Sequence, residues 1–217
     1  MRPVDHVLRV FTDQEGRFGN FLGIFLETHE WSDDFCQSRA HDLGFSETVF
    51  VDDLATGRIR IFTPSTKLGF AGHPTVGAAW LIDHLGQEMH SLQCDAGHVW
   101  TVATKLGATV LADPAWSPPI ELRQVDSPEV VDSYALWDGS STYVWAWIDE
   151  GAGTVRARAF LSEVGIPEDE ATGSAAVLLA ASLGRALRIR QGVGSRIDVG
   201  PTHTGKVALS GDVARDG

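Results

Sequence analysis

The sequence predicts an α+β protein made of two pseudo-symmetric domains, each a mostly antiparallel sheet around one central helix. Two segments, at about 74–85 and 173–183, are apolar on nearly all sides, and such a helix is normally buried. Each is entered through a glycine-containing loop and is followed by a glycine, Gly86 or Gly184, that suits a left-handed helix end. The other segments are mainly strand-like, which favours an antiparallel sheet over alternating βαβ units.

The two helical segments also align with each other. Placing Gly86 over Gly184 superimposes three further pairs of like residues: Leu85 on Leu183, Leu81 on Leu179 and Ala78 on Ala176. We interpret this short repeat as an internal duplication in which both helix N-termini face one cleft. We therefore predict domains over residues 1–104 and 105–217.

The segment before the first central helix alternates between strands and polar loops. Hydrophobic alternation predicts four strands, at residues 6–12, 21–26, 45–51 and 58–63. Ser32 is a suitable N-cap for a helix over about 33–43, which Gly44 ends. In the third strand Glu47, Val49 and Val51 share one face of the sheet.

The first central helix begins at the loop Gly72-His-Pro-Thr75. Pro74 suits the first turn, because the N–H that proline lacks has no intrahelical acceptor there. The unpaired N–H groups of such a helix start carry partial positive charge and can bind an anion. Small residues after the loop, such as Gly77, leave room for other backbone to pack closely.

Beyond Gly86 the sequence predicts short strands and turns. The strands are expected at residues 91–94, 98–104, 107–112, 143–148, 154–160, 187–191, 195–199 and 206–209. The proline-rich segment 113–119 breaks regular structure, and Pro128 suits the first position of a short helix over 127–132.

Composition excludes several classes of protein. The chain has 217 residues, 43% of them hydrophobic, and a net charge of −12, which disfavours a nucleic-acid partner or an anionic membrane surface. No apolar run reaches the length of a membrane span, and the N-terminus lacks the apolar core of a signal peptide. We expect a soluble cytoplasmic protein.

The sequence also lacks the common nucleotide-binding motifs. No Gly-x-Gly-x-x-Gly follows a strand and no phosphate-loop lysine motif occurs, so we expect no nucleotide cofactor. The two cysteines, Cys36 and Cys94, lack zinc-ligand spacing and are expected to be buried and reduced. The tryptophans are scattered, and we interpret most of them as core residues: Trp31, Trp80, Trp100, Trp116, Trp137, Trp145 and Trp147.

Four motifs, in order along the chain, carry a resemblance. They are Ser46-Glu-Thr-Val-Phe50, Arg60-Ile-Phe-Thr-Pro64, Phe70-Ala-Gly-His-Pro-Thr75 with Gly77-Ala-Ala79, and Glu168-Asp-Glu-Ala-Thr-Gly-Ser-Ala-Ala176. Together, from about Val7 to Asp212, the chain resembles the PhzF-like family of phenazine biosynthesis, which has the diaminopimelate-epimerase fold.

This resemblance implies a homodimer with an active site in the cleft between two domains. It implies an isomerase that moves a proton between carbons of a small carboxylated metabolite, such as a dihydro-hydroxyanthranilate, without cofactor or metal. Glu47 corresponds to the family's acid/base, and His73 and Asp169 to its assisting residues. We expect the substrate to be bound around the two helix starts, by Gly72, Thr75, Val76, Gly77, Thr172, Gly173 and Ser174.

The chain departs from the family pattern in several places. Gly19-Asn20-Phe21 replaces the more usual Gly-Asn-Pro, and Asp169-Glu170-Ala-Thr-Gly replaces Asp-Pro-Ala-Thr-Gly. The chain is also shorter than typical members, mainly between about 104 and 160. That region supplies the far wall of the substrate pocket, so the motifs do not name the substrate.

The residue types suit proton transfer. A carboxyl group can take and return a proton near neutral pH if an apolar cleft raises its pKa, and Glu47 lies among apolar residues on its strand. Glu47 could instead be an edge-strand carboxylate paired with an arginine. His73 could assist Glu47 or cap its helix, and Asp169 could bind a substrate amine or hydroxyl, orient His73, or only complement a helix dipole.

Three functions remain open at this point. The first is the isomerase, and the second is a small-molecule binding or regulatory protein that keeps the cleft without catalysis. The third is a lyase or hydrolase that uses the same Glu and His. A two-thiol racemase of the same fold is disfavoured, because neither Cys36 nor Cys94 precedes a central helix.

Overall fold

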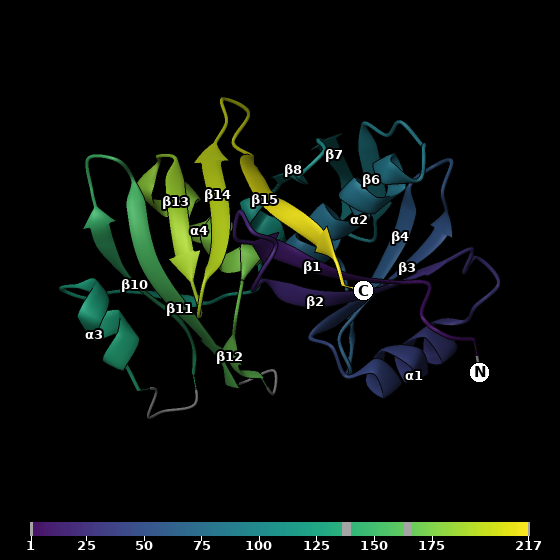
Figure 1. Ribbon diagram of the computed structural model, residues 1–217, viewed down its shortest axis with the longest axis horizontal. Coiled ribbons are helices and arrows are strands. Elements are labelled where there is room, and N and C mark those ends of the chain that lie inside the picture. The colour runs from purple at the N-terminus through teal and green to yellow at the C-terminus, as the bar shows by residue number, and fades with distance from the viewer. Residues whose placement is uncertain (1, 136–139, 163–165, 217) are drawn as a thin grey trace.

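The computed structural model describes residues 2–135, 140–162 and 166–216, so Trp137 lies outside the described residues. A mixed sheet of many short strands dominates the fold, and few helices accompany it (Figure 1). The strands are β1 His6–Thr12, β2 Asn20–Leu26, β3 Glu47–Asp53, β4 Arg58–Phe62, β5 Lys67–Leu68, β6 Ser91–Cys94, β7 Gly97–Ala103, β8 Gly107–Ala112, β9 Glu121–Gln124, β10 Ser141–Asp149, β11 Thr154–Leu161, β12 Ile166–Asp169, β13 Leu187–Gln191, β14 Ser195–Pro201 and β15 Val207–Arg215. The helices are α1 Asp33–Leu43, α2 Gly72–His84, α3 Pro128–Ser133 and α4 Gly173–Leu183, with a 3-10 turn η1 at Pro114–Trp116.

Strand β15 connects the two ends of a circuit of strands. The order is β1-β2-β3-β4-β6-β7-β8-β15, and β15 also pairs with β1, so these strands close on themselves. Helix α2 packs against most of this circuit, and the β8 strand beyond residue 104 is among its main contacts. The sheet continues from β15 through β14, β13, β11 and β10 to β9, and α4 packs against β14 and β15.

Most neighbouring strands are antiparallel, as the sequence predicts, and the parallel pairs are β2–β3, β4–β6, β9–β10 and β11–β13. In Figure 1, β10, β11, β13 and β14 lie with α4 on one side, α2 lies among β4 and β6 on the other, and β1, β2 and β15 cross between them. The division into two domains at residue 104 stays a prediction.

The strand β3 shows how the alternation of the sequence places the core. Val49 and Val51 face the main core around α2, whereas Phe50 faces a second cluster under α1 that includes Cys36. Both faces of β3 are therefore buried, with the predicted division of residues between them. Cys36 and Cys94 are buried and unpaired, which confirms that interpretation of the cysteines.

Helix α1 has the predicted ends. The Ser32 hydroxyl accepts a hydrogen bond from the Phe35 amide at 3.2 Å, and Gly44 adopts a left-handed φ of 67°. Helix α4 likewise begins at Gly173 and is followed by Gly184 with a φ of 64°.

Helix α2 begins two residues earlier than predicted, at Gly72. Pro74 is thus the third helical residue, which the helix tolerates because N–H groups of the first turn have no intrahelical acceptor. Gly77 lies in the next turn, where an added Cβ would be 2.5 Å from a methyl carbon of Leu22. This close approach explains why the helix carries small residues at this point.

The short strands β5, β9 and β12 were not predicted from the sequence. β12 pairs with β11 and ends at Asp169, in the segment that leads into the second central helix. The tryptophans differ in burial: Trp80 and Trp145 are core residues, while 58% of the Trp100 surface is exposed. Of the described helices, none is long and apolar enough to span a membrane.

Candidate active site

The N-termini of α2 and α4 meet at a cavity of about 570 Å³. An added Cβ on Gly72 would lie 2.8 Å from the Gly173 Cα, so the two helix starts are in direct backbone contact. The first N–H groups of each helix have no acceptor within that helix, and the positive ends of both helix dipoles point to the same place. Such an arrangement favours a carboxylate or another anion in the cavity.

Glu47, the first residue of β3, lines this cavity. Its side chain is 16% exposed, and its Oε2 atom is buried without a hydrogen-bond partner among the described residues. Burial raises the pKa of this carboxyl to about 7, although a hydrogen bond from Ser46 acts in the opposite direction. Glu47 can therefore gain and lose a proton near neutral pH.

His73, the second residue of α2, faces Glu47. Its Nε2 atom lies 3.5 Å from Glu47 Oε2 and has no hydrogen-bond partner among the described residues. Burial lowers the pKa of His73 to about 4, while the nearby Asp169 carboxyl and a hydrogen bond to the Phe21 backbone favour the charged form. The imidazole is thus neutral at pH 7, and the Phe21 carbonyl fixes which ring nitrogen faces Glu47.

Asp169, the last residue of β12, also lines the cavity. Its Oδ1 atom accepts a hydrogen bond from the Asn20 side-chain amide at 2.7 Å, and its Oδ2 atom accepts one from the Thr172 hydroxyl at 2.6 Å. Burial, and next the charge of Glu47, raise the pKa of Asp169, whereas both hydrogen bonds lower it. The structure thus brings together Glu47, His73 and Asp169, the three residues that the sequence predicts as catalytic.

The structure adds a buried polar network to these residues. The Gln191 side-chain amide donates to the Thr172 hydroxyl at 2.9 Å and to the Asp169 carbonyl at 2.9 Å. Its carbonyl oxygen accepts hydrogen bonds from the Tyr143 hydroxyl at 3.0 Å and the Thr172 amide at 3.1 Å. Tyr143 lies in β10 and Gln191 in β13, on either side of Asp169 in the sequence. No local pattern in the sequence connects them with Asp169.

Apolar and hydroxyl groups make up the rest of the cavity wall. The ring centroids of Phe70 and Trp116 lie 5.4 Å apart, and the apolar part of the wall also includes Leu68, Leu161 and Ile166. Hydroxyl-bearing residues lie around it: Thr63, Ser65, Thr66 and Ser117. The described lining residues include no lysine or arginine. Trp116, interpreted as core from the sequence, is therefore a wall residue, in the segment where the chain departs most from the family pattern.

The predicted substrate-binding residues divide into two groups. Gly72, Thr172, Gly173 and Ser174 line the cavity. Thr75, Val76 and Gly77 lie behind it, because α2 begins at Gly72 and its second turn is already buried against the sheet. The Thr75 amide and hydroxyl both donate to the Ala71 carbonyl, so they are used within the helix.

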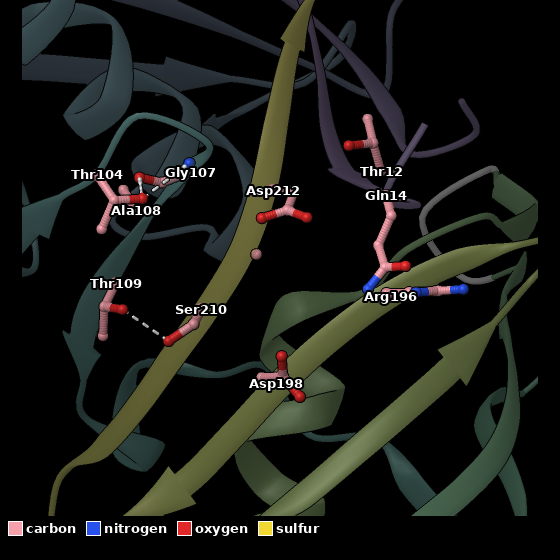
Figure 2. Close-up of a pocket in the computed structure, with 11 residues that line it drawn as sticks. Thr12, Gln14, Thr104, Gly107, Ala108, Thr109, Arg196, Asp198, Ser210 and Asp212 are labelled. Atoms are coloured by element: carbon pink, nitrogen blue, oxygen red, sulfur yellow. Dashed lines mark hydrogen bonds between the residues drawn. The ribbon is translucent and has the colours of Figure 1, made fainter. Parts of the chain in front are cut away.

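A smaller hollow of about 200 Å³ lies on the other face of the sheet (Figure 2). Leu209 of β15 faces Gly72 and Gly173, so its neighbour Ser210 points to the opposite side, where it is hydrogen-bonded to Thr109 at 2.8 Å. Asp198 and Asp212 also line this hollow, and burial raises the pKa of both carboxyls. It is separate from the cavity that holds Glu47.

No cluster of three or more His, Cys, Asp or Glu side chains suited to a metal ion occurs within the described part of the chain. The described titratable residues that line the cavity are two carboxyls and one imidazole.

A family model described as "Phenazine biosynthesis-like protein" matches residues 8–155. An uncharacterized isomerase of Pasteurella multocida is 40% identical over 101 residues, which cover 43% of this chain and 34% of that protein. The trans-2,3-dihydro-3-hydroxyanthranilate isomerase of Pseudomonas aeruginosa is 28% identical over 218 residues, covering 80% of this chain and 77% of that protein.

Among solved structures, a PhzC/PhzF protein from Clostridium difficile has a TM-score of 0.79 at 19% identity, covering 98% of this chain and 96% of the other. This likeness concerns the fold alone. The match to the family model spans the strand of Glu47 and the helix start of His73, so the chain belongs to the phenazine biosynthesis-like (PhzC-PhzF) protein family.

Proposed function

We propose that this protein is an isomerase that moves a proton between carbons of a small carboxylated metabolite, with Glu47 as the acid/base. The observation that carries the proposal is the facing pair Glu47 Oε2 and His73 Nε2, both buried and both without a hydrogen-bond partner in the described structure. A buried polar atom without a partner is costly, and a ligand in the cavity would supply the missing partner.

The proton balance of the proposed reaction is simple. The Glu47 carboxylate takes a proton from an sp³ carbon, and the electron pair left behind delocalises into the adjacent unsaturated system of the substrate. Glu47 then returns the proton to a second carbon on the same face, so the double bond moves and the enzyme regains its first state. A carboxyl group with a pKa of about 7 suits both half-reactions.

The other groups would hold the substrate. The N–H groups at the starts of α2 and α4 suit a substrate carboxylate, which compensates for the absence of lysine and arginine among the described lining residues. Phe70 and Trp116, which pack against each other in the cavity wall, suit contact with a flat or unsaturated ring. Asp169, fixed by Asn20 and Thr172, would accept a hydrogen bond from a substrate amine or hydroxyl, or orient His73.

On this proposal the reaction needs no cofactor and no metal, because one carboxyl group both removes and returns the proton. The name of the Pseudomonas aeruginosa relative indicates which substrate to try first, a dihydro-hydroxyanthranilate. A homodimer in the cytoplasm also remains part of the proposal, and light scattering of the purified protein would measure its mass in solution.

Proton NMR in deuterated buffer tests the reaction. We expect wild type to introduce deuterium at a ring carbon of the probe acid, and Glu47→Gln to be at least about 100-fold slower. Glu88→Gln is a matched control, since the Glu88 side chain is 86% exposed and lies outside the cavity lining. Full exchange by Glu47→Gln would refute Glu47 as the shuttle.

Binding of the probe without exchange, by wild type, would instead favour the binding-protein alternative. A product that has lost or gained a group, rather than an isomer, would favour the lyase or hydrolase. Both outcomes would overturn the isomerase proposal for this probe while the geometry of the cavity stands.

A further inference from the structure

Glu170, next to Asp169, has its carboxylate inserted into the turn between β13 and β14. It accepts hydrogen bonds from the Val193 amide at 2.8 Å, the Gly194 amide at 3.2 Å and the Ser195 hydroxyl at 2.7 Å. Three donors on one carboxylate fix both the turn and the backbone that leads out of Asp169.

The Ser195 hydroxyl extends this contact to the N-terminal part of the chain. Ser195 is fully buried, and its Oγ atom accepts a hydrogen bond from the Gly19 amide at 2.9 Å. Gly19 has a φ of 75°, and an added Cβ there would lie 2.5 Å from the Val10 carbonyl oxygen. The loop before β2 is therefore held in one tight conformation at the residue that precedes Asn20.

Asn20, the next residue, links this loop back to Asp169. Its side-chain amide donates to Asp169 Oδ1 at 2.7 Å and to the Ala171 carbonyl at 3.0 Å. A closed ring thus runs from Asp169 to Glu170 along the chain, to Ser195 and Gly19 by hydrogen bonds, and from Asn20 back to Asp169. The ring joins segments that are 149 to 176 residues apart in the sequence.

We propose that Glu170 and Ser195 are positioning residues of the site, which hold the Asn20 amide against the Asp169 carboxylate. The role rests on the proposed function, since Asp169 is a site residue only if the cavity is catalytic. Neither Glu170 nor Ser195 faces the reacting atoms; they act through Gly19 and Asn20. The glutamate thereby gives a physical reason for one departure from the family motif, because a proline at position 170 would lack the carboxylate that fixes the turn.

Ser195→Ala tests the ring directly, because it removes the acceptor of the Gly19 amide and leaves the volume nearly unchanged. We expect hydrogen exchange of the Gly19 amide, followed by NMR, to accelerate about fivefold or more relative to wild type. Ser210→Ala is the matched control: it removes a hydroxyl with a 2.8 Å hydrogen bond on the far side of β15 (Figure 2). It should leave the Gly19 amide unchanged.

A second measurement separates positioning from a merely structural role. The carbon-13 resonance of the Asp169 carboxyl reports its titration, and we expect its pKa to move upward in Ser195→Ala as the Asn20 hydrogen bond weakens. Glu170→Gln should have the same effect, since its N–H₂ group replaces one of the two carboxylate oxygens and cannot accept from the backbone amide at that oxygen, Val193 or Gly194. Under the proposed function, kcat for proton exchange should fall more than KM changes.

These experiments can refute the positioning role separately from the proposed isomerase activity. Unchanged Gly19 exchange in Ser195→Ala, or an unchanged Asp169 titration in both variants, would overturn the ring as a positioning device. If wild type exchanges no proton into any probe acid, but the Asp169 titration still moves in both variants, the ring stands and the proposed isomerase falls.

Discussion

The burial of Glu47 has a consequence for stability that can be measured without any substrate. In the folded protein the pKa of Glu47 rises from 4.5 to about 7. Because the folded state binds this proton more tightly than the unfolded state, protonation of Glu47 stabilises the folded protein. The stabilisation is full below about pH 4.5 and is lost as the pH rises through 7. At about 1.4 kcal/mol per pKa unit, the loss amounts to about 3 kcal/mol.

Glu47→Gln replaces this carboxyl with a group that has no charge at any pH. We therefore expect the free energy of unfolding of Glu47→Gln, relative to wild type, to increase by about 3 kcal/mol between pH 4 and pH 8.5. Urea unfolding followed by circular dichroism at intervals of half a pH unit would measure it. Glu88→Gln, at an exposed site, should show no such trend.

A difference between Glu47→Gln and wild type that stays constant from pH 4 to 8.5 would refute the reasoning. It would mean that the carboxyl is as well solvated in the folded state as in the unfolded chain. The cavity would then be open to water at Glu47, and a raised pKa could no longer support an acid/base role.

Two further predictions concern packing and thiols. Gly72→Ala should destabilise the protein by about 1–3 kcal/mol in urea unfolding, because its Cβ would lie 2.8 Å from the Gly173 Cα. Gly200→Ala, whose added Cβ has its nearest neighbour at 3.4 Å, should change stability much less. Equal effects of the two substitutions would contradict the close contact of the helix starts. Burial raises the pKa of Cys36 to about 11 and also raises that of Cys94. Iodoacetamide at pH 7.5 should therefore label both thiols about 100-fold more slowly in native protein than in urea. Fast labelling of one thiol in native protein, measured by mass spectrometry, would contradict this prediction.

Much of the local structure follows from the sequence, because its causes lie within a few residues. Ser32 and Gly44 set the two ends of α1, and the alternation of side chains along β3 divides its residues between two buried clusters. Even the start of α2 differs from the prediction by only two residues, since Gly72 and His73 can be helical ahead of Pro74.

Pairing between distant segments could not be predicted in the same way. Strand β12 exists because its backbone completes the edge of β11, and its own four residues have little strand character. The closure of β1 onto β15 likewise depends on the register of the two ends of the chain. Such contacts are long-range, so no local propensity encodes them.

The candidate site shows the same division. The motifs bring Glu47, His73 and Asp169 to attention, and the structure places all three around one cavity. In the sequence Asn20 stands out only as part of a departure from the family motif, and no motif marks Gln191 or Tyr143 as site residues. Thr75, Val76 and Gly77 belong to the same motif as His73, yet they are buried within α2 and do not line the cavity.

The environments of the two carboxyls indicate how they would share the work on the proposed mechanism. Both lose hydration on burial, and the charge of Glu47 raises the pKa of Asp169, so the pair resists carrying two negative charges. Donors are unevenly distributed, because Asn20 and Thr172 both donate to Asp169, whereas Oε2 of Glu47, opposite His73 Nε2, has no hydrogen-bond partner among the described residues. Asp169 is thus held in place while Glu47 is free to exchange its proton with a ligand. The supply of hydrogen bonds, rather than the type of side chain, separates a fixed carboxyl from a mobile proton carrier.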